Sequence, residues 1–127
     1  MAAGKLPKLN VYGNDYPTSD GTGVRDYIHV IDLADGHNAA LTYLVKNSGW
    51  SAINLGTGLG YSVLEIVAAF QEASGRRIPF EMVVRRPGDI ATCVASAKKA
   101  KDVLNWQARY SIQEMCASSW LWQKKSD

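Results

Sequence analysis

The strongest constraint on the fold is the alternation of short strand-like segments with helices that carry their own start and stop signals. Apolar residues recur at helical spacing through residues 30–45, and Asn47 and Gly49 end that pattern. Two later helices begin at capping boxes, in which a serine precedes a glutamate by three residues. These boxes are Ser62 with Glu65 and Ser111 with Glu114. The alternation predicts an α/β fold.

The remaining elements are short and are separated by turn-forming segments. A polar loop covers residues 14–23, and loops of this length and composition are often binding loops. Pro79, at the beginning of one strand, is typical of an edge strand. The expected elements are strands at 9–12, 52–55 and 78–84, extended segments at 26–30 and 92–94, and a short helix at 96–104.

Length and composition limit the classes of function. The 127 residues correspond to one domain or part of one, and 46% hydrophobic residues argue against disorder. A net charge of +2 predicts no nucleic-acid partner, and the longest apolar run, residues 66–70, is far short of the ~20 residues of a membrane span. Without a signal-like start, we expect a cytoplasmic chain in which Cys93 and Cys116 are reduced thiols. No metal site is expected, because neither cysteine has a CxxC partner.

The glycine-rich segment at residues 56–61 follows an expected strand and precedes a capped helix. It fits a dinucleotide-binding turn only in part, because Tyr61 stands at the position of the third glycine and no acidic residue follows at the required distance. A tight strand-to-helix turn accounts for the segment better. We therefore expect no cofactor-binding residue in this chain.

Two arginines lie on loops beside glycine or proline: Arg25 follows Gly23, and Arg86 precedes Pro87. A guanidinium can grip a phosphate or a carboxylate with two hydrogen bonds. Asp89 could accept hydrogen bonds from sugar hydroxyls. The alternative is that both arginines form surface ion pairs, Arg25 with a nearby aspartate and Arg86 with Asp89, and spacing alone favours this alternative.

No complete catalytic constellation is present, so no catalytic residue is expected. His29 precedes the first long helix and would need an orienting partner such as Asp26 or Asp32. His37 lies on the apolar helix face, where we expect it to be packed. None of the tyrosines has a lysine four residues later, and the sequence holds neither a G-x-S-x-G elbow nor a P-loop.

Several blocks together resemble the UDP-glucose 4-epimerase family, whose members are extended short-chain dehydrogenases/reductases. The blocks are NVYGNDYPTSDGTGVRDYIHVIDLADGHNAAL, INLGTGLGYSVLEIV, RRPGD and LNW. The resemblance covers nearly the whole chain, and its first block is specific to this enzyme, which interconverts UDP-glucose and UDP-galactose.

The resemblance implies that residues 1–127 are the C-terminal UDP-sugar-binding region of a Rossmann-type enzyme. The NAD-binding Rossmann domain and its Tyr-x-x-x-Lys would lie outside this chain, which would be inactive alone, and the intact enzyme would be a homodimer. The alternatives are a free-standing nucleotide-sugar-binding module, a non-functional truncation, or another extended reductase such as a dehydratase or decarboxylase. The first block argues against the last of these.

The resemblance also assigns substrate-binding roles. The strand at 9–12 would hold the uracil, two arginines the diphosphate, and an aspartate the ribose hydroxyls. Cys93 stands where bacterial epimerases commonly carry tyrosine and the vertebrate type carries cysteine. Because a thiol is much smaller than a phenol, we expect room for the 2-acetamido group of UDP-N-acetyl sugars. The implied binding residues are Leu9, Asn10, Val11, Tyr12, Arg25, Tyr27, Val63, Arg86, Asp89 and Cys93.

Overall fold

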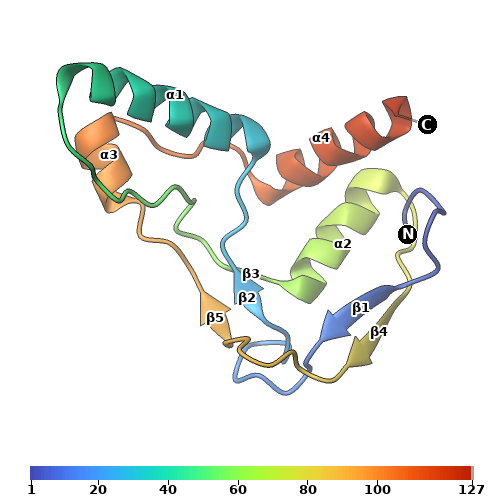
Figure 1. Cartoon of the computed structure of the whole chain (residues 1–127). Helices are drawn as coiled ribbons and strands as arrows, with labels where there is room; N and C mark the ends of the chain where they lie inside the picture. Colours follow the sequence, from blue (N-terminus) through green and yellow to red (C-terminus); the bar gives the residue numbers. More distant parts are fainter. Residues whose placement is uncertain (127) are drawn as a thin grey trace.

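The computed structural model describes residues 1–126 as short strands interleaved with helices (Figure 1). The α/β class expected from the sequence is confirmed. In chain order the elements are β1 (Leu9–Tyr12), β2 (Val24–Arg25), α1 (Val30–Lys46), β3 (Tyr61–Ser62), α2 (Val63–Ser74), β4 (Phe80–Val83), β5 (Thr92–Cys93), α3 (Lys98–Leu104) and α4 (Ile112–Lys125).

The strands form two small sheets. β1 pairs with β4 in parallel, with Leu9 opposite Phe80, and the Leu9 N–H donates to the Pro79 carbonyl at 2.9 Å. β2 lies in the middle of the second sheet, antiparallel to β3 and parallel to β5. The loops that follow β1 and β4 therefore leave the first sheet at the same end.

The predicted helix signals are confirmed. Both capping boxes are formed, with the serine hydroxyl accepting from the backbone N–H three residues later and the glutamate accepting from the serine N–H. Gly75 ends α2 in the left-handed conformation, with φ at 65°. Asn105 ends α3 in the same way, with φ at 52°. These local signals set the helix boundaries.

Buried apolar side chains form two clusters. In the larger one, α2 packs against α4 through residues that include Val67, Cys116 and Trp120, and the Phe70 and Trp120 rings meet edge-on at 6.4 Å. The smaller one lies where α3 packs against α1, and it contains Ala100 and Trp106.

The apolar stripe of α1 faces away from the rest of the chain. Val45 is 86% exposed and Val30 is 69% exposed, whereas the buried positions of this helix are Asp32 and Gly36. The expectation that His37 is packed is wrong: its ring is exposed and hydrogen-bonds the Leu33 carbonyl oxygen at 2.7 Å. The predicted helix is present, but no element among residues 1–126 covers its apolar stripe.

The strands differ from the prediction at three places, one of which is β3, where Tyr61 and Ser62 pair with β2 although no strand was expected there. Residues 52–55 form no strand, because no other strand of the described chain runs beside them, and they pack near α1 and α3 through side chains such as Leu55. Conversely, Val24 and Arg25 form β2 at the end of the long loop, ahead of the predicted extended segment at 26–30. Val24 and Arg25 form a strand because they pair with β3 and β5. A local sequence pattern does not show which segments will pair. None of the helices in residues 1–126 is long and apolar enough to cross a membrane.

Candidate functional site

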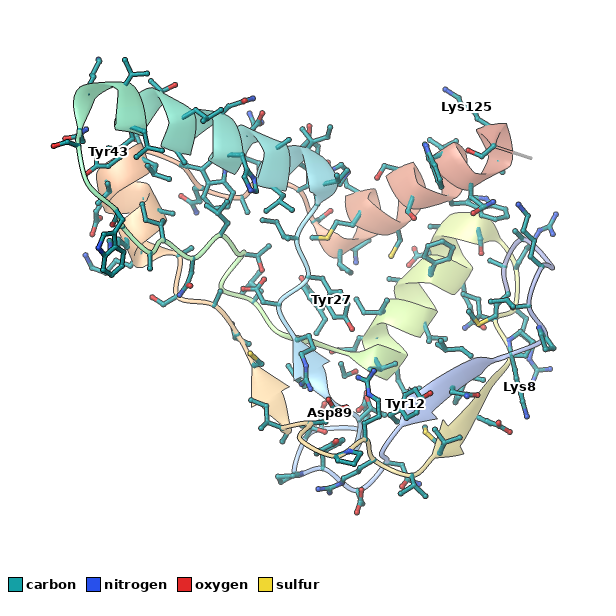
Figure 2. All side chains as sticks on the ribbon, viewed as in Figure 1. Lys8, Tyr12, Tyr27, Tyr43, Asp89 and Lys125 are labelled. Atoms are coloured by element: carbon teal, nitrogen blue, oxygen red, sulfur yellow. The ribbon has the colours of Figure 1, made fainter. Side chains whose placement is uncertain are left out.

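A cavity of about 260 Å³ lies where β1, β2, the start of α2 and the turn after β4 meet. Figure 2 shows Tyr12 and Asp89 near one another at this end of the molecule, with Tyr27 between the β2–α1 connection and α2. The residues that line the cavity are Asn10, Val11, Tyr12, Tyr16, Gly23, Arg25, Tyr27, Val63, Arg86 and Asp89. Eight of the ten residues singled out from the sequence therefore surround one space.

Arg86 joins an aromatic side chain and a carboxylate at the rim of the cavity. Its guanidinium lies 4.7 Å from the centre of the Tyr12 ring, and its Nε donates to Asp89 Oδ2 at 3.0 Å. The ion pair that spacing favoured is thus present. Because Arg86 is more than half exposed, this pair contributes little stability, and the remaining guanidinium N–H groups stay free to donate.

Arg25 has no acidic partner within residues 1–126, so the alternative of an ion pair with Asp26 or with an aspartate of the preceding loop is wrong. Its Nη1 donates to the Val24 carbonyl at 2.7 Å and reaches the Ala91 carbonyl at 3.5 Å. Two arginines and one aspartate give the cavity lining a formal charge of +1, which favours an anionic ligand.

Tyr27 lies beside Arg25 and is half buried. Burial raises the pKa of its phenol, and the neighbouring guanidinium of Arg25 offsets part of that rise. The hydroxyl is therefore neutral at pH 7 and can donate a hydrogen bond to a ligand in the cavity.

Tyr16 is a lining residue that the sequence reasoning missed. It is buried, and the Arg85 guanidinium lies 3.9 Å from the centre of its ring while Arg85 Nε donates to Asp15 Oδ1 at 2.6 Å. A Cβ on Gly13 would lie 2.5 Å from the ring, so glycine is required there. The only available signal was the glycine directly after β1, which marks a turn without showing what packs on it.

Leu9 and Cys93 do not line this cavity. Leu9 faces an apolar cavity of about 420 Å³ beside α2 and α4. Cys93 is exposed on β5, where the strand register sets it opposite Arg25. Its thiol is thus near the cationic end of the site and outside the enclosed space.

The glycine-rich turn at residues 56–58 uses its backbone N–H groups within the chain. The N–H of Thr57 donates to Asp26 Oδ1 at 2.9 Å, and the N–H of Gly58 donates to Asp26 Oδ2 at 3.0 Å. A pyrophosphate would need such groups free. These residues therefore do not fit an NAD site. The expected strand-to-helix turn is not formed either, because residues 52–55 are not a strand and the segment leads into β3 before α2 begins.

His29 serves as the cap of α1 and is not paired with Asp26 or Asp32. Its Nδ1 accepts from the Ile31 N–H at 3.0 Å, and its ring stacks on Tyr110 at 4.3 Å. Because Nδ1 is an acceptor, Nε2 carries the proton and donates to the Ser118 hydroxyl at 2.8 Å. The imidazole cannot act as a base toward that serine.

Comparisons with known proteins agree with this geometry. A family model described as GDP-mannose 4,6 dehydratase matches residues 1–119. The chain belongs to that family of extended short-chain dehydrogenases/reductases. Within the family, its relatives include the UDP-glucose 4-epimerase of Bacillus subtilis, which is 58% identical over 99% of this chain, and the UDP-glucose 4-epimerase of Pisum sativum, which is 56% identical over 99%.

Solved structures of the family superimpose closely on this chain. A UDP-glucose 4-epimerase from Bifidobacterium longum, solved in complex with NAD⁺ and UDP, gives a TM-score of 0.93 at 53% identity over 98% of the chain. The resemblance to UDP-glucose 4-epimerases is confirmed. The chain spans 37% of the length of each of these three proteins.

Proposed function

We propose that this chain is the UDP-sugar-binding part of a UDP-glucose 4-epimerase that interconverts UDP-galactose and UDP-glucose. The observation that carries the proposal is the cavity in which two arginines, an aspartate and Tyr12 meet. An arginine pair suits a diphosphate, a carboxylate suits ribose hydroxyls, and an aromatic ring suits a pyrimidine. The family relationship supports each of these assignments.

In this proposal the chain holds the nucleotide and leaves the sugar free to turn. Backbone groups of Asn10 and Val11 and the Tyr12 ring hold the uracil, with Val63 beside the nucleoside. Arg25 and Arg86 hold the diphosphate, about which the sugar turns. Uniform binding of UDP then keeps the sugar C4 within reach of the reacting groups in either orientation.

Cys93 is proposed to set the sugar specificity. It is exposed and lies opposite Arg25, so a sugar linked to a diphosphate held by Arg25 would lie close to it. Because a thiol is small, the parent enzyme accepts UDP-N-acetyl sugars as well. In the complete enzyme, Cys93→Tyr should abolish turnover of UDP-N-acetylgalactosamine and spare UDP-galactose, and equal loss of both would contradict the assignment.

The rest of the enzyme is proposed to be a Rossmann domain that binds NAD and supplies the catalytic Tyr-x-x-x-Lys. When bound there, NAD supplies the hydride-transfer chemistry. The exposed stripe of α1 and an apolar cavity of about 660 Å³ between residues 27–31 and α4 are the surfaces that this domain would cover. The complete enzyme is proposed to be a cytoplasmic homodimer, and the unpaired thiols of Cys93 and Cys116 suit a reducing compartment.

UDP titration of the chain tests the proposed site. We expect weak saturable binding, because part of the pocket wall is missing, with backbone NMR shifts centred on β1, β2 and the 86–89 turn. Arg25→Gln should weaken UDP binding about tenfold, since it removes charge-assisted hydrogen bonds. Arg76→Gln is the matched control, because Arg76 lines no part of the cavity and its guanidinium lies 5.5 Å from the centre of the Trp120 ring. Equal effects of the two substitutions would contradict the proposal.

In this proposal, activity requires the NAD-binding domain together with this chain. The purified chain with NAD and UDP-galactose should form no UDP-glucose. A chimera in which this chain replaces the matching segment of the Bacillus subtilis enzyme should epimerise, and Arg25→Gln in that chimera should lower kcat/KM at least tenfold. An inactive but folded chimera that binds NAD would refute the assigned activity.

A further inference from the structure

We propose that Asp26 is a positioning residue of the UDP-sugar site. Its carboxylate connects β2, which ends in Arg25, to the chain that follows Cys93 of β5. It would therefore set the distance between Arg25, which is proposed to bind the diphosphate, and Cys93, which is proposed to face the sugar. The inference rests on the proposed function and deepens it. Asp26 lines no part of the cavity, so it would act through its neighbours.

Four hydrogen bonds converge on this carboxylate. Oδ1 accepts from the N–H and the hydroxyl of Thr57, at 2.9 and 2.6 Å. Oδ2 accepts from the N–H of Gly58 at 3.0 Å and from the N–H of Ala95 at 3.3 Å. The Asp26 N–H itself donates to the Cys93 carbonyl at 3.1 Å. One residue therefore fixes three segments that are far apart in the sequence.

The second sheet needs these additional hydrogen bonds because its strands are very short. β2 and β5 have two residues each, against about five or six in an ordinary strand. Their register places Arg25 opposite Cys93, and a shift of one residue would turn the Cys93 thiol to the other face. Ala95, which Asp26 holds, lies only two residues beyond Cys93, so the side chain fixes this register.

The arrangement requires a carboxylate and not merely a small polar side chain. All four partners are donors, and a carboxylate only accepts, whereas an amide would turn an NH₂ toward an N–H. Burial alone raises the pKa of Asp26, but the hydrogen bonds from Thr57, Gly58 and Ala95 outweigh burial and hold the pKa below its usual value. A Cβ on Gly56 would lie 2.6 Å from Oδ2, so the turn closes directly around the charge.

The test compares Asp26→Asn with the unsubstituted 127-residue chain by NMR, using UDP as the ligand and amide hydrogen exchange as a second readout. We expect UDP affinity to fall about tenfold and the amides of Gly58 and Ala95 to exchange faster. Thr57→Val removes one of the four donors and should produce a smaller change in the same direction. The double variant should lose less than the sum of the two effects, since both act on one network.

Asp32→Asn is the matched control. The Asp32 carboxylate accepts from the N–H groups of Arg109 and Tyr110, at 3.0 Å each, and lines no part of the cavity. This variant should lower the stability of the fold and leave UDP affinity unchanged. If Asp26→Asn and Asp32→Asn reduce UDP affinity equally, the role of Asp26 is general stability and the inference is wrong.

Two further outcomes separate this inference from the proposed function. If Arg25→Gln abolishes UDP binding while Asp26→Asn loses amide protection but keeps its affinity, the inference fails and the proposed function stands. If the unsubstituted chain gives no saturable response to UDP, both fail. Should Asp26→Asn not fold, Thr57→Val decides the question, because faster exchange at Gly58 without loss of UDP affinity overturns the inference.

Discussion

Two glycines with the same backbone conformation differ in what surrounds them. Gly13 and Gly88 both have φ at 86°, but a Cβ on Gly13 would lie 2.5 Å from Tyr16 and 2.8 Å from Arg85, whereas a Cβ on Gly88 meets nothing within 4 Å. Gly88→Ala should cost about 1–2 kcal/mol of unfolding free energy for the left-handed backbone alone. Gly13→Ala should cost about 2 kcal/mol more, because it also overpacks the site. Urea denaturation of both variants measures the difference. Equal losses of unfolding free energy would show that the Tyr16 ring moves aside without a measurable energetic cost.

Asp20 makes the stability of the loop before β2 depend on pH. Burial raises the pKa of its carboxyl, but hydrogen bonds from the Ser62 hydroxyl and from the N–H and hydroxyl of Thr22 outweigh burial and lower it. A lowered folded-state pKa gives stability that is present above the unfolded pKa and is lost as pH falls through the folded value. We expect the urea concentration at the midpoint of unfolding to decrease when the pH is lowered below about 4. The Asp20→Asn variant should be less stable at pH 7, but its free energy of unfolding should decrease less on acidification. If its stability depends on pH as strongly as that of the unsubstituted chain, Asp20 does not have this role.

The residues of the candidate site were predictable to different degrees. Arg25, Arg86 and Asp89 stand in sequence blocks that identify the family, so their convergence could be expected from the resemblance. Tyr16 and Asp26 stand in the same first block, but the resemblance assigns no role to either of them. Their surroundings depend on packing and on hydrogen bonds to segments 31 to 69 residues away, which no local pattern reveals.

Two helices begin with the same motif but place it in different surroundings. Ser111 is exposed and caps only α4, whereas Ser62 is fully buried, caps α2 and also donates to Asp20. Ser111→Ala should cost about 1 kcal/mol, the usual value for a lost cap. Ser62→Ala should cost about 1–3 kcal/mol more, because it also removes a hydrogen bond to the ionisable Asp20 carboxylate, which is partly buried. Thermal unfolding of the two variants provides the measurement, and equal shifts in Tm would show that the contact with Asp20 contributes nothing.

The elements also show which parts of a fold are written locally. Capping boxes and left-handed terminators act over one turn of chain, so α2 and α4 begin where the sequence predicts. Strands need a partner, and partners come from elsewhere in the chain. Residues 52–55 have the composition of a strand but no neighbouring strand in residues 1–126, whereas Val24 and Arg25 become β2 because β3 and β5 lie on either side.

At the scale of the whole molecule, α1 has two faces with opposite roles. Its packed side presents Asp32 and Gly36 to the chain, while its apolar stripe, including Leu41 and Val45, is open to solvent. An exposed stripe of this kind favours association.

We therefore expect the isolated chain to self-associate at about 100 µM, a concentration at which weak apolar contacts become populated. Leu41→Glu with Val45→Glu should restore a monomer of 13.9 kDa in light scattering, because it places two charges on the stripe. Asn38→Glu with Thr42→Glu adds the same charge to exposed positions beside the stripe and should leave association largely unchanged. If both pairs dissolve the assemblies equally, net charge and not the apolar face controls them. If the unsubstituted chain is monomeric throughout, the stripe is not adhesive, and the proposal that another domain covers it loses its physical support.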